Sequence, residues 1–185
     1  MATEIQGAKI VTEEIENAAG ANPYSITLTA EQATTSNSSI IFGSIPAGTK
    51  RITIMLDAVS TSGSSPLILQ LGDGGGIETT GYVGSLWQQN SAGSDGGVVV
   101  GDTNGLEVTA TATAATGYTG QAIFSLENAG TFTWVGNSHM GNSPTRVMSL
   151  ATTAKSLTAE LTQISLTTAG GSDTFDAGVA SIQFQ

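Results

Sequence analysis

Beyond its N-terminal segment, the chain consists of short apolar stretches separated by glycine-rich turns, and this pattern constrains the fold more than any other feature. In one stretch Ile52, Ile54, Leu56 and Ala58 share a face, which is the two-residue period of a strand that buries one side. Residues 72–76 are a typical glycine-rich turn. Many short strands divided by such turns indicate a sandwich or a barrel. The pattern therefore predicts an all-β fold.

The stretches that we expect to form strands are residues 26–28, 40–42, 51–59, 67–71, 98–100, 106–111, 121–126, 131–135, 146–151, 156–168 and 179–184. The stretch 156–168 is longer than a typical strand, so we allow for a bend within it. Phe132 and Trp134 share one side of their expected strand. We therefore expect one side of that strand to lie in the core.

The composition indicates a folded protein whose surface is rich in hydroxyl and amide groups and poor in charge. Charged residues make up 11% of the 185 residues, against about 25% in typical globular domains. Hydrophobic residues make up 39%, which is too many for a disordered polar tract. The length suits one domain with a small appendage. The absence of cysteine excludes disulfides and thiolate metal sites.

The few charges are mostly negative: 15 acidic residues stand against five basic ones, for a net charge of −10. Nucleic acids and anionic lipids attract clustered Lys and Arg, and here only Lys50 and Arg51 are adjacent, so we expect neither partner. The N-terminus has no basic start followed by an apolar run, and no window reaches the about 18 apolar residues that span a bilayer. We expect a soluble protein that is made in the cytoplasm.

Residues 1–22 have a different pattern from the rest of the chain. Ile5, Val11 and Ile15, with alanines between and after them, recur at spacings of three and four residues, which is a helical period. The segment is too short to form a stable helix alone, and the proline that follows it disfavours a continuing helix. We predict an N-terminal arm or short helix over residues 1–22 and a β domain over residues 23–185. The arm would gain order only against a partner or against its own domain.

Two stretches of the sequence resemble a domain that recurs in structural proteins of tailed bacteriophages. Residues 43–84 contain an Ile-Pro pair before a strand with a Lys-Arg-Ile-Thr start, then a Ser-Thr-Ser-Gly-Ser-Ser turn and the segment QLGDGGGIETTGY. Residues 156–185 contain the segment GSDTFDAG, followed by a final alternating strand. The resemblance covers most of residues 40–185 and is less distinctive over residues 85–155.

This resemblance implies a jelly-roll-like β-sandwich that belongs to a virion. Short, self-contained chains of this kind are capsid decoration (cement) proteins, which join neighbouring shell subunits. We therefore expect a structural protein without enzymatic activity, assembled as a homotrimer on the major capsid protein at the capsid surface. Ile5, Val11 and Ile15 of the arm would contact a neighbouring subunit or the shell. The alternative is the tip of a tail or head fibre that binds host glycans.

Residues that could support catalysis are few. His139 is the only histidine and lies in a segment that we interpret as a loop, so no nucleophile–base pair is expected. Asp73 with Glu78, and Asp173 with Asp176, are the carboxylate pairs that glycoside cleavage would use, but a long sugar groove requires a larger body. We expect no catalytic residues.

Turn carboxylates could instead bind calcium or hold turns. We expect no metal and no cofactor, because no EF-hand or nonapeptide repeat is present, although calcium remains an alternative for the loop aspartates. In GSDTFDAG we expect the two aspartates to accept local backbone hydrogen bonds while Phe175 enters the core. Trp87, in a stretch that we interpret as a loop, is the aromatic residue that we expect to contact a partner. The candidate calcium ligands are Asp73, Asp95, Asp102, Asp173 and Asp176.

Overall fold

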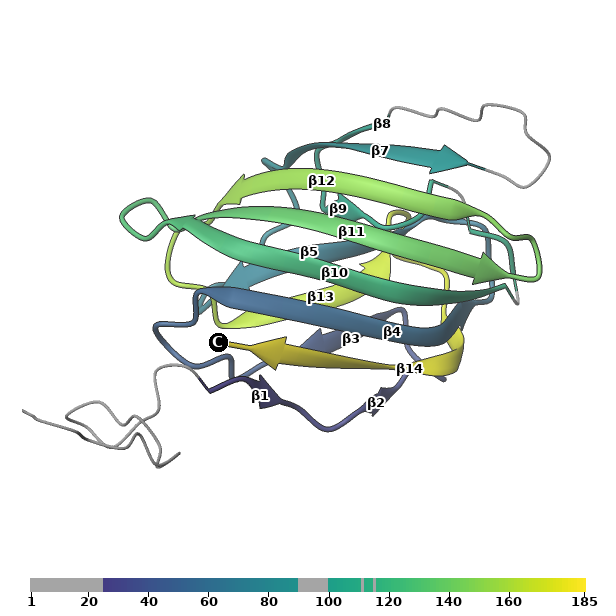
Figure 1. Cartoon of the computed structure of the whole chain (residues 1–185), viewed down its shortest axis with the longest axis horizontal. Helices are drawn as coiled ribbons and strands as arrows, with labels where there is room; N and C mark the ends of the chain where they lie inside the picture. The colour runs from purple at the N-terminus through teal and green to yellow at the C-terminus, as the bar shows by residue number, and fades with distance from the viewer. Residues whose placement is uncertain (1–24, 90–99, 111, 115) are drawn as a thin grey trace, which may run out of the picture.

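The computed structural model describes residues 25–89, 100–110, 112–114 and 116–185, with the backbone alone for 100–102, and in these residues all regular secondary structure is β (Figure 1). In chain order the strands are β1 (Thr27–Leu28), β2 (Gln32–Ala33), β3 (Ser39–Phe42), β4 (Arg51–Thr61), β5 (Leu67–Asp73), β6 (Gly76–Ile77), β7 (Val83–Gln89), β8 (Val100–Asp102), β9 (Leu106–Glu107), β10 (Gly117–Asn128), β11 (Thr133–Ser143), β12 (Met148–Ser156), β13 (Gln163–Thr168) and β14 (Phe175–Phe184).

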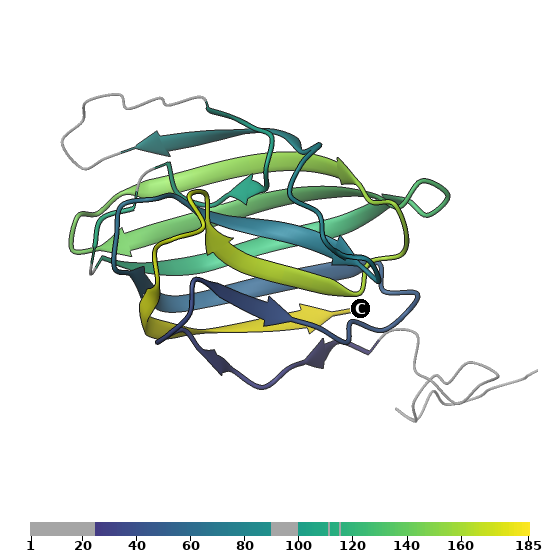
Figure 2. The same cartoon turned by 180° about the vertical axis from the view of Figure 1, so that it is seen from behind.

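The strands form two antiparallel sheets that pack face to face. The larger sheet has nine strands in the order β1-β14-β4-β10-β11-β12-β7-β8, and β2 also pairs with β14. This sheet lies in front in Figure 1. The smaller sheet has five strands in the order β3-β13-β5-β6, with β9 also paired to β5, and lies in front in Figure 2. The predicted β-sandwich is therefore confirmed, whereas the jelly-roll arrangement stays a prediction.

The core lies between the two sheets. On β4 the residues Ile52 and Ile54 point inward and are fully buried, and Phe124 of β10 lies beside them. The smaller sheet contributes Leu69 and Ile164, which are also fully buried. The alternation read from the sequence thus places Ile52, Ile54 and Leu56 in the core, because successive side chains of a strand point to opposite faces. The expected inward position of Ala58 is wrong: the pairing of β4 with its neighbours shifts register there, Ala58 is exposed and Val59 is buried instead.

Two expected loops are strands, so these two interpretations were wrong. Trp87 belongs to β7 and His139 belongs to β11. Their strands lack a clear apolar alternation because inward positions hold small or polar residues, such as Gly84 on β7 and Gly136 and Ser138 on β11. Pairing with neighbouring strands compensates for this weak pattern: β11 is hydrogen-bonded on both sides, to β10 and to β12.

The last turn differs from expectation in its hydrogen bonds. Phe175 is buried in the core, as predicted. The two aspartates bond across the structure rather than locally: an Asp173 oxygen accepts a hydrogen bond from the Ser65 backbone N–H at 2.9 Å, and Asp176 accepts one from the Ser60 hydroxyl. The first contact ties the β13–β14 connection to the β4–β5 connection, and the second joins the neighbouring strands β14 and β4. The expected bend is confirmed between β12 and β13, where residues 157–162 are not in a strand.

We predict that Gly136→Ala destabilises the domain while Gly141→Ala does not. A Cβ at Gly136 would lie 2.5 Å from the Phe124 ring in the core, whereas a Cβ at Gly141 on the same strand would approach nothing closer than 3.9 Å. Overpacking a core typically costs about 1–3 kcal/mol, and an open position typically changes the free energy of unfolding by less than about 0.5 kcal/mol. Urea unfolding of the two variants measures the difference, and equal stabilities would contradict this packing.

Candidate binding face

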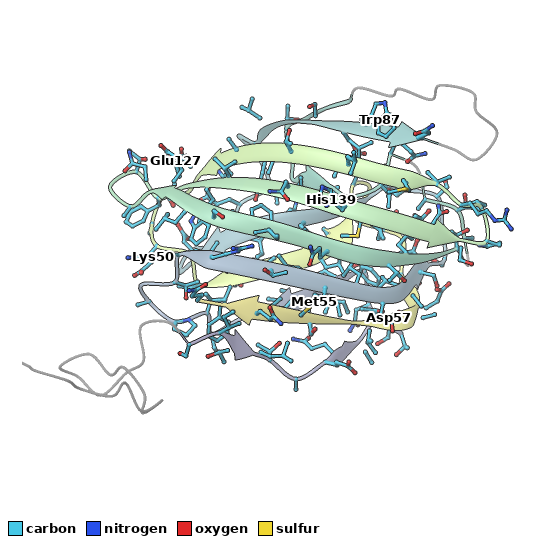
Figure 3. All side chains as sticks on the ribbon, viewed as in Figure 1. Lys50, Met55, Asp57, Trp87, Glu127 and His139 are labelled. Carbon is cyan, nitrogen blue, oxygen red and sulfur yellow. The ribbon has the colours of Figure 1, made fainter. Side chains whose placement is uncertain are left out.

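The side of the larger sheet that points away from the smaller sheet is an open surface, which we call the outer face. Its side chains lie in rows of cross-strand neighbours. In one row Trp87 of β7 is opposite Leu150 of β12, which is opposite His139 of β11. The row continues through Gln121 of β10 to Met55 of β4. Figure 3 views this face and labels Trp87, His139 and Met55 along it.

Exposed large hydrophobic side chains gather at two places on the outer face. We call Ile26 and Leu28 the β1 margin; they line grooves with outer-face residues of β4 and β14. The second place, at the far end of the face, is the β7 margin, which consists of Val83, Trp87, Val135, Met148 and Leu150. Five strand spacings separate β1 from β12, which carries Met148 and Leu150, or about 24 Å at about 4.8 Å per strand. Among the described residues, one further large hydrophobic side chain is exposed, that of Ile41 on the smaller sheet.

The charged side chains of this face lie near the ends of the long strands and at the β1 edge, where Glu31 lines the same groove as Leu28. Lys50, Arg51 and Glu127 lie at one end of the long strands and Asp57 lies near the other (Figure 3). Between these ends the outward positions of β4, β10, β11 and β12 hold hydroxyl, amide and aliphatic side chains and the imidazole of His139. The low charge of the sequence therefore leaves the middle of this sheet face uncharged.

A hollow of about 370 Å³ lies in the β7 margin. Its outward side chains come from three neighbouring strands and form two adjacent rows, one with Trp87 at its end and one with Ser85 at its end. Trp87 is 42% exposed, so much of its indole is accessible. Trp87, which the sequence predicts to contact a partner, therefore lies on an accessible surface. The side chains that line the hollow on this face are Ser85, Trp87, Asn137, His139, Leu150 and Thr152.

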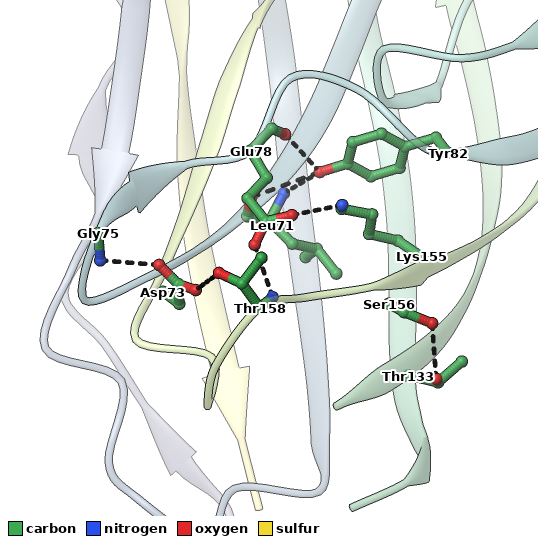
Figure 4. A network of polar contacts seen from close by, with 9 residues as sticks. All are labelled: Leu71, Asp73, Gly75, Glu78, Tyr82, Thr133, Lys155, Ser156 and Thr158. Atoms are coloured by element: carbon green, nitrogen blue, oxygen red, sulfur yellow. Dashed lines mark hydrogen bonds and ion pairs between the residues drawn. The ribbon is translucent and has the colours of Figure 1, made fainter. Parts of the chain in front are cut away.

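The carboxylates Asp73 and Glu78, named as a possible catalytic pair, lie together in a partly buried polar network (Figure 4). Asp73 accepts a hydrogen bond from the Thr158 hydroxyl at 2.6 Å, and Glu78 accepts one from the Thr158 backbone N–H at 2.8 Å. Glu78 also forms an ion pair with the buried Lys155 of β12, whose ammonium lies 5.5 Å from the centre of the Tyr82 ring.

Each charge in this network has a partner, and the network connects the two sheets. Hydrogen bonds from Thr158 and the Gly75 backbone N–H hold the pKa of Asp73 below its usual value. Burial opposes the ionisation of Glu78, but the hydrogen bonds and positive charge of Lys155 and the Thr158 N–H outweigh it, so the pKa of Glu78 is also lowered. Burial raises the pKa of Tyr82. Two ionised, fully partnered carboxylates stabilise the fold, and neither is the raised-pKa acid that glycoside cleavage uses.

Asp173 and Asp176, the second candidate carboxylate pair, accept hydrogen bonds from different segments, as described above. Within the described residues, no group of three or more His, Asp or Glu side chains converges on a possible metal position. Ile5, Val11, Ile15 and Asp95 lie outside the described residues, as does the side chain of Asp102. Nor do the described residues contain a helix long and apolar enough to cross a membrane.

Comparisons of the chain with models of protein families, with curated proteins and with solved structures find no match.

We predict that the network of Asp73 and Glu78 makes the domain sensitive to acid. Because the pKa values of Asp73 and Glu78 are lower in the folded state than their ordinary values of 3.8 and 4.5, the unfolded chain binds more protons at acidic pH. The stabilisation is complete above these ordinary values and is lost as the pH falls below them. Urea unfolding between pH 7 and pH 3 should give a shallower decline for Asp73→Asn and for Thr158→Val than for the wild type. Parallel declines for all three proteins would contradict the assigned role of the network.

Proposed function

We propose that this protein is a structural, non-catalytic component of a tailed-phage particle that decorates the capsid and stabilises it by bridging neighbouring shell subunits. The observation that carries this proposal is the outer face, which is uncharged across the middle of its central strands and has exposed hydrophobic side chains at two separated margins. Large exposed apolar patches on a folded domain mark interaction surfaces. Depletion of charge and enrichment of aromatic residues and Met are typical of the centre of protein interfaces.

A decoration protein stabilises a shell by mass action, because it binds the assembled state and not the separated subunits. A homotrimer on a three-fold position matches closed cyclic symmetry, and each protomer then anchors to a different shell subunit. A surface with few charges favours both kinds of contact, since little charge has to be desolvated when the surfaces meet.

The β1 margin is the surface that we assign to the shell. Ile26 and Leu28 are 63% and 59% exposed and lie at the edge of the sheet, where the chain enters the β domain from residues 1–22. A shell contact here would be continuous with the contact that the sequence predicts for the arm. The resemblance of residues 40–185 to phage structural proteins supports a place on the virion and does not bear on this margin.

We predict that the double substitution Ile26→Ser/Leu28→Ser weakens attachment to capsids assembled without this protein. Loss of two exposed aliphatic side chains from an interface should raise the Kd at least about tenfold, which corresponds to about 1.4 kcal/mol. Ile41→Ser is the matched control: Ile41 is 50% exposed but lies on the smaller sheet, so this variant should bind like the wild type. Co-sedimentation with the capsids measures both. Undiminished binding of the double variant would remove the β1 margin from the shell contact.

We also predict that the purified full-length chain is a homotrimer. Static light scattering should then give a mass three times the 18.6 kDa of one chain at micromolar concentration. A single 18.6 kDa species, both free and when released from particles, would contradict the symmetric bridging model.

A second candidate function is recognition of a host glycan by a fibre tip, and the hollow beside Trp87 favours it. Ligand sites combine an apolar platform with a few polar groups that fix orientation, and the hollow has both. Copy number separates the two functions: hundreds of copies per virion indicate decoration, and a few to a few dozen indicate a fibre.

A further inference from the structure

We propose that the hollow in the β7 margin is a binding subsite for an uncharged pyranose ring of a glycan. This inference rests on the second candidate function but is independent of the first, because the β1 margin and the hollow are at opposite ends of the outer face. A decoration protein anchored by its β1 margin could therefore also use this subsite.

The apolar part of the hollow is formed by Trp87 and Leu150, which are direct cross-strand neighbours on β7 and β12. Both are partly exposed, at 42% and 38%, and together they form a platform on the sheet. One face of a pyranose ring consists largely of C–H groups, which pack against an indole while the hydroxyls remain at the rim. An exposed aromatic ring whose body is apolar and whose edge is hydrated suits such a ligand.

The polar part of the hollow is unused by the fold. Asn137 and His139 lie on β11, and Ser85 and Thr152 form a cross-strand pair beside Trp87. All four side chains are exposed, and none makes a hydrogen bond within the described part of the chain. An amide, an imidazole and two hydroxyls offer donors and acceptors, which is the mixture that sugar hydroxyls require.

The charge and size of the hollow decide the class of ligand. Its lining contains no Lys, Arg, Asp or Glu, and the whole chain carries a net charge of −10, so a sialylated, uronic or phosphorylated glycan would find no cation and an unfavourable potential. Its volume of about 370 Å³ lies in the range of about 300–1,000 Å³ that is typical of small-molecule sites. A stable protein contact would need about 800 Å² on each partner, a far larger area than a hollow three strands wide.

The two tryptophans provide a test with an internal control. Trp87 lines the hollow, whereas Trp134 is 2% exposed in the core. We would titrate full-length ¹⁵N-labelled protein with maltohexaose, cellohexaose and mannohexaose, and with oligogalacturonate as the acidic probe, and follow the two indole N–H resonances. At least one neutral probe should shift the Trp87 resonance saturably in the millimolar range and leave Trp134 in place, while oligogalacturonate should shift neither.

Variants identify the residues involved. Trp87→Ala should weaken binding of the positive probe at least tenfold, Trp87→Phe should retain part of the affinity, and Asn137→Ala should weaken binding several-fold. Val83→Ala is the matched control, because Val83 is 75% exposed on the same strand outside the hollow; it should bind like the wild type.

Three results would overturn the proposal: no neutral probe binds at millimolar concentration, the acidic probe binds more tightly than the neutral ones, or Trp87→Ala changes the mass measured by light scattering. The last result would make the β7 margin a contact between copies of the chain. Attachment of Trp87→Ala to capsids is measured in parallel and should be unchanged, so failure of the saccharide site and failure of the decoration role are distinguishable.

Discussion

Apolar packing between the two sheets is the interaction on which the rest of the structure depends. Ile52, Ile54 and Phe124 on the larger sheet and Leu69 and Ile164 on the smaller sheet are all fully buried. With no cysteine in the chain, burial of this kind and the strand hydrogen bonds hold the domain together. The network of Asp73, Glu78 and Lys155 adds a polar connection between the sheets near the edge of this core.

The neutral outer face follows from this packing. An antiparallel sheet needs only one face in the core, so the other face of the larger sheet is available to solvent or to partners. In most domains such a face is charged, but here its central positions are occupied by residues such as Gln121, Thr152 and Met55. Removing water from a surface of this kind costs little free energy, because few charges lose their hydration. The surface therefore suits either a protein contact or an uncharged glycan.

The sequence predicted the fold class, because apolar residues recur with period two on strands such as β4 and glycine-rich turns separate the strands. It also predicted the burial of Phe175, the apolar residue of the GSDTFDAG segment. It misassigned Trp87 and His139 to loops because their strands carry Gly84, Gly136 and Ser138 at inward positions. The hollow could not be predicted, since Trp87, Leu150 and Asn137 come from three strands whose register is set by pairing across the sheet. Alternation of Met148, Leu150 and Thr152 with Ser149, Ala151 and Thr153 was visible, but it does not reveal which side is open.

Footprinting by hydroxyl radicals on free and capsid-bound protein tests the central claim, that the outer face is the functional surface, most directly. Met and Trp side chains oxidise readily when they are accessible. We predict that capsid binding protects Met55, beside the β1 margin, while Met148 and Trp87 at the β7 margin stay reactive and the buried Met140 and Trp134 stay unreactive in both states. Unchanged oxidation of Met55 on the capsid, with protection confined to residues of the smaller sheet, would contradict it.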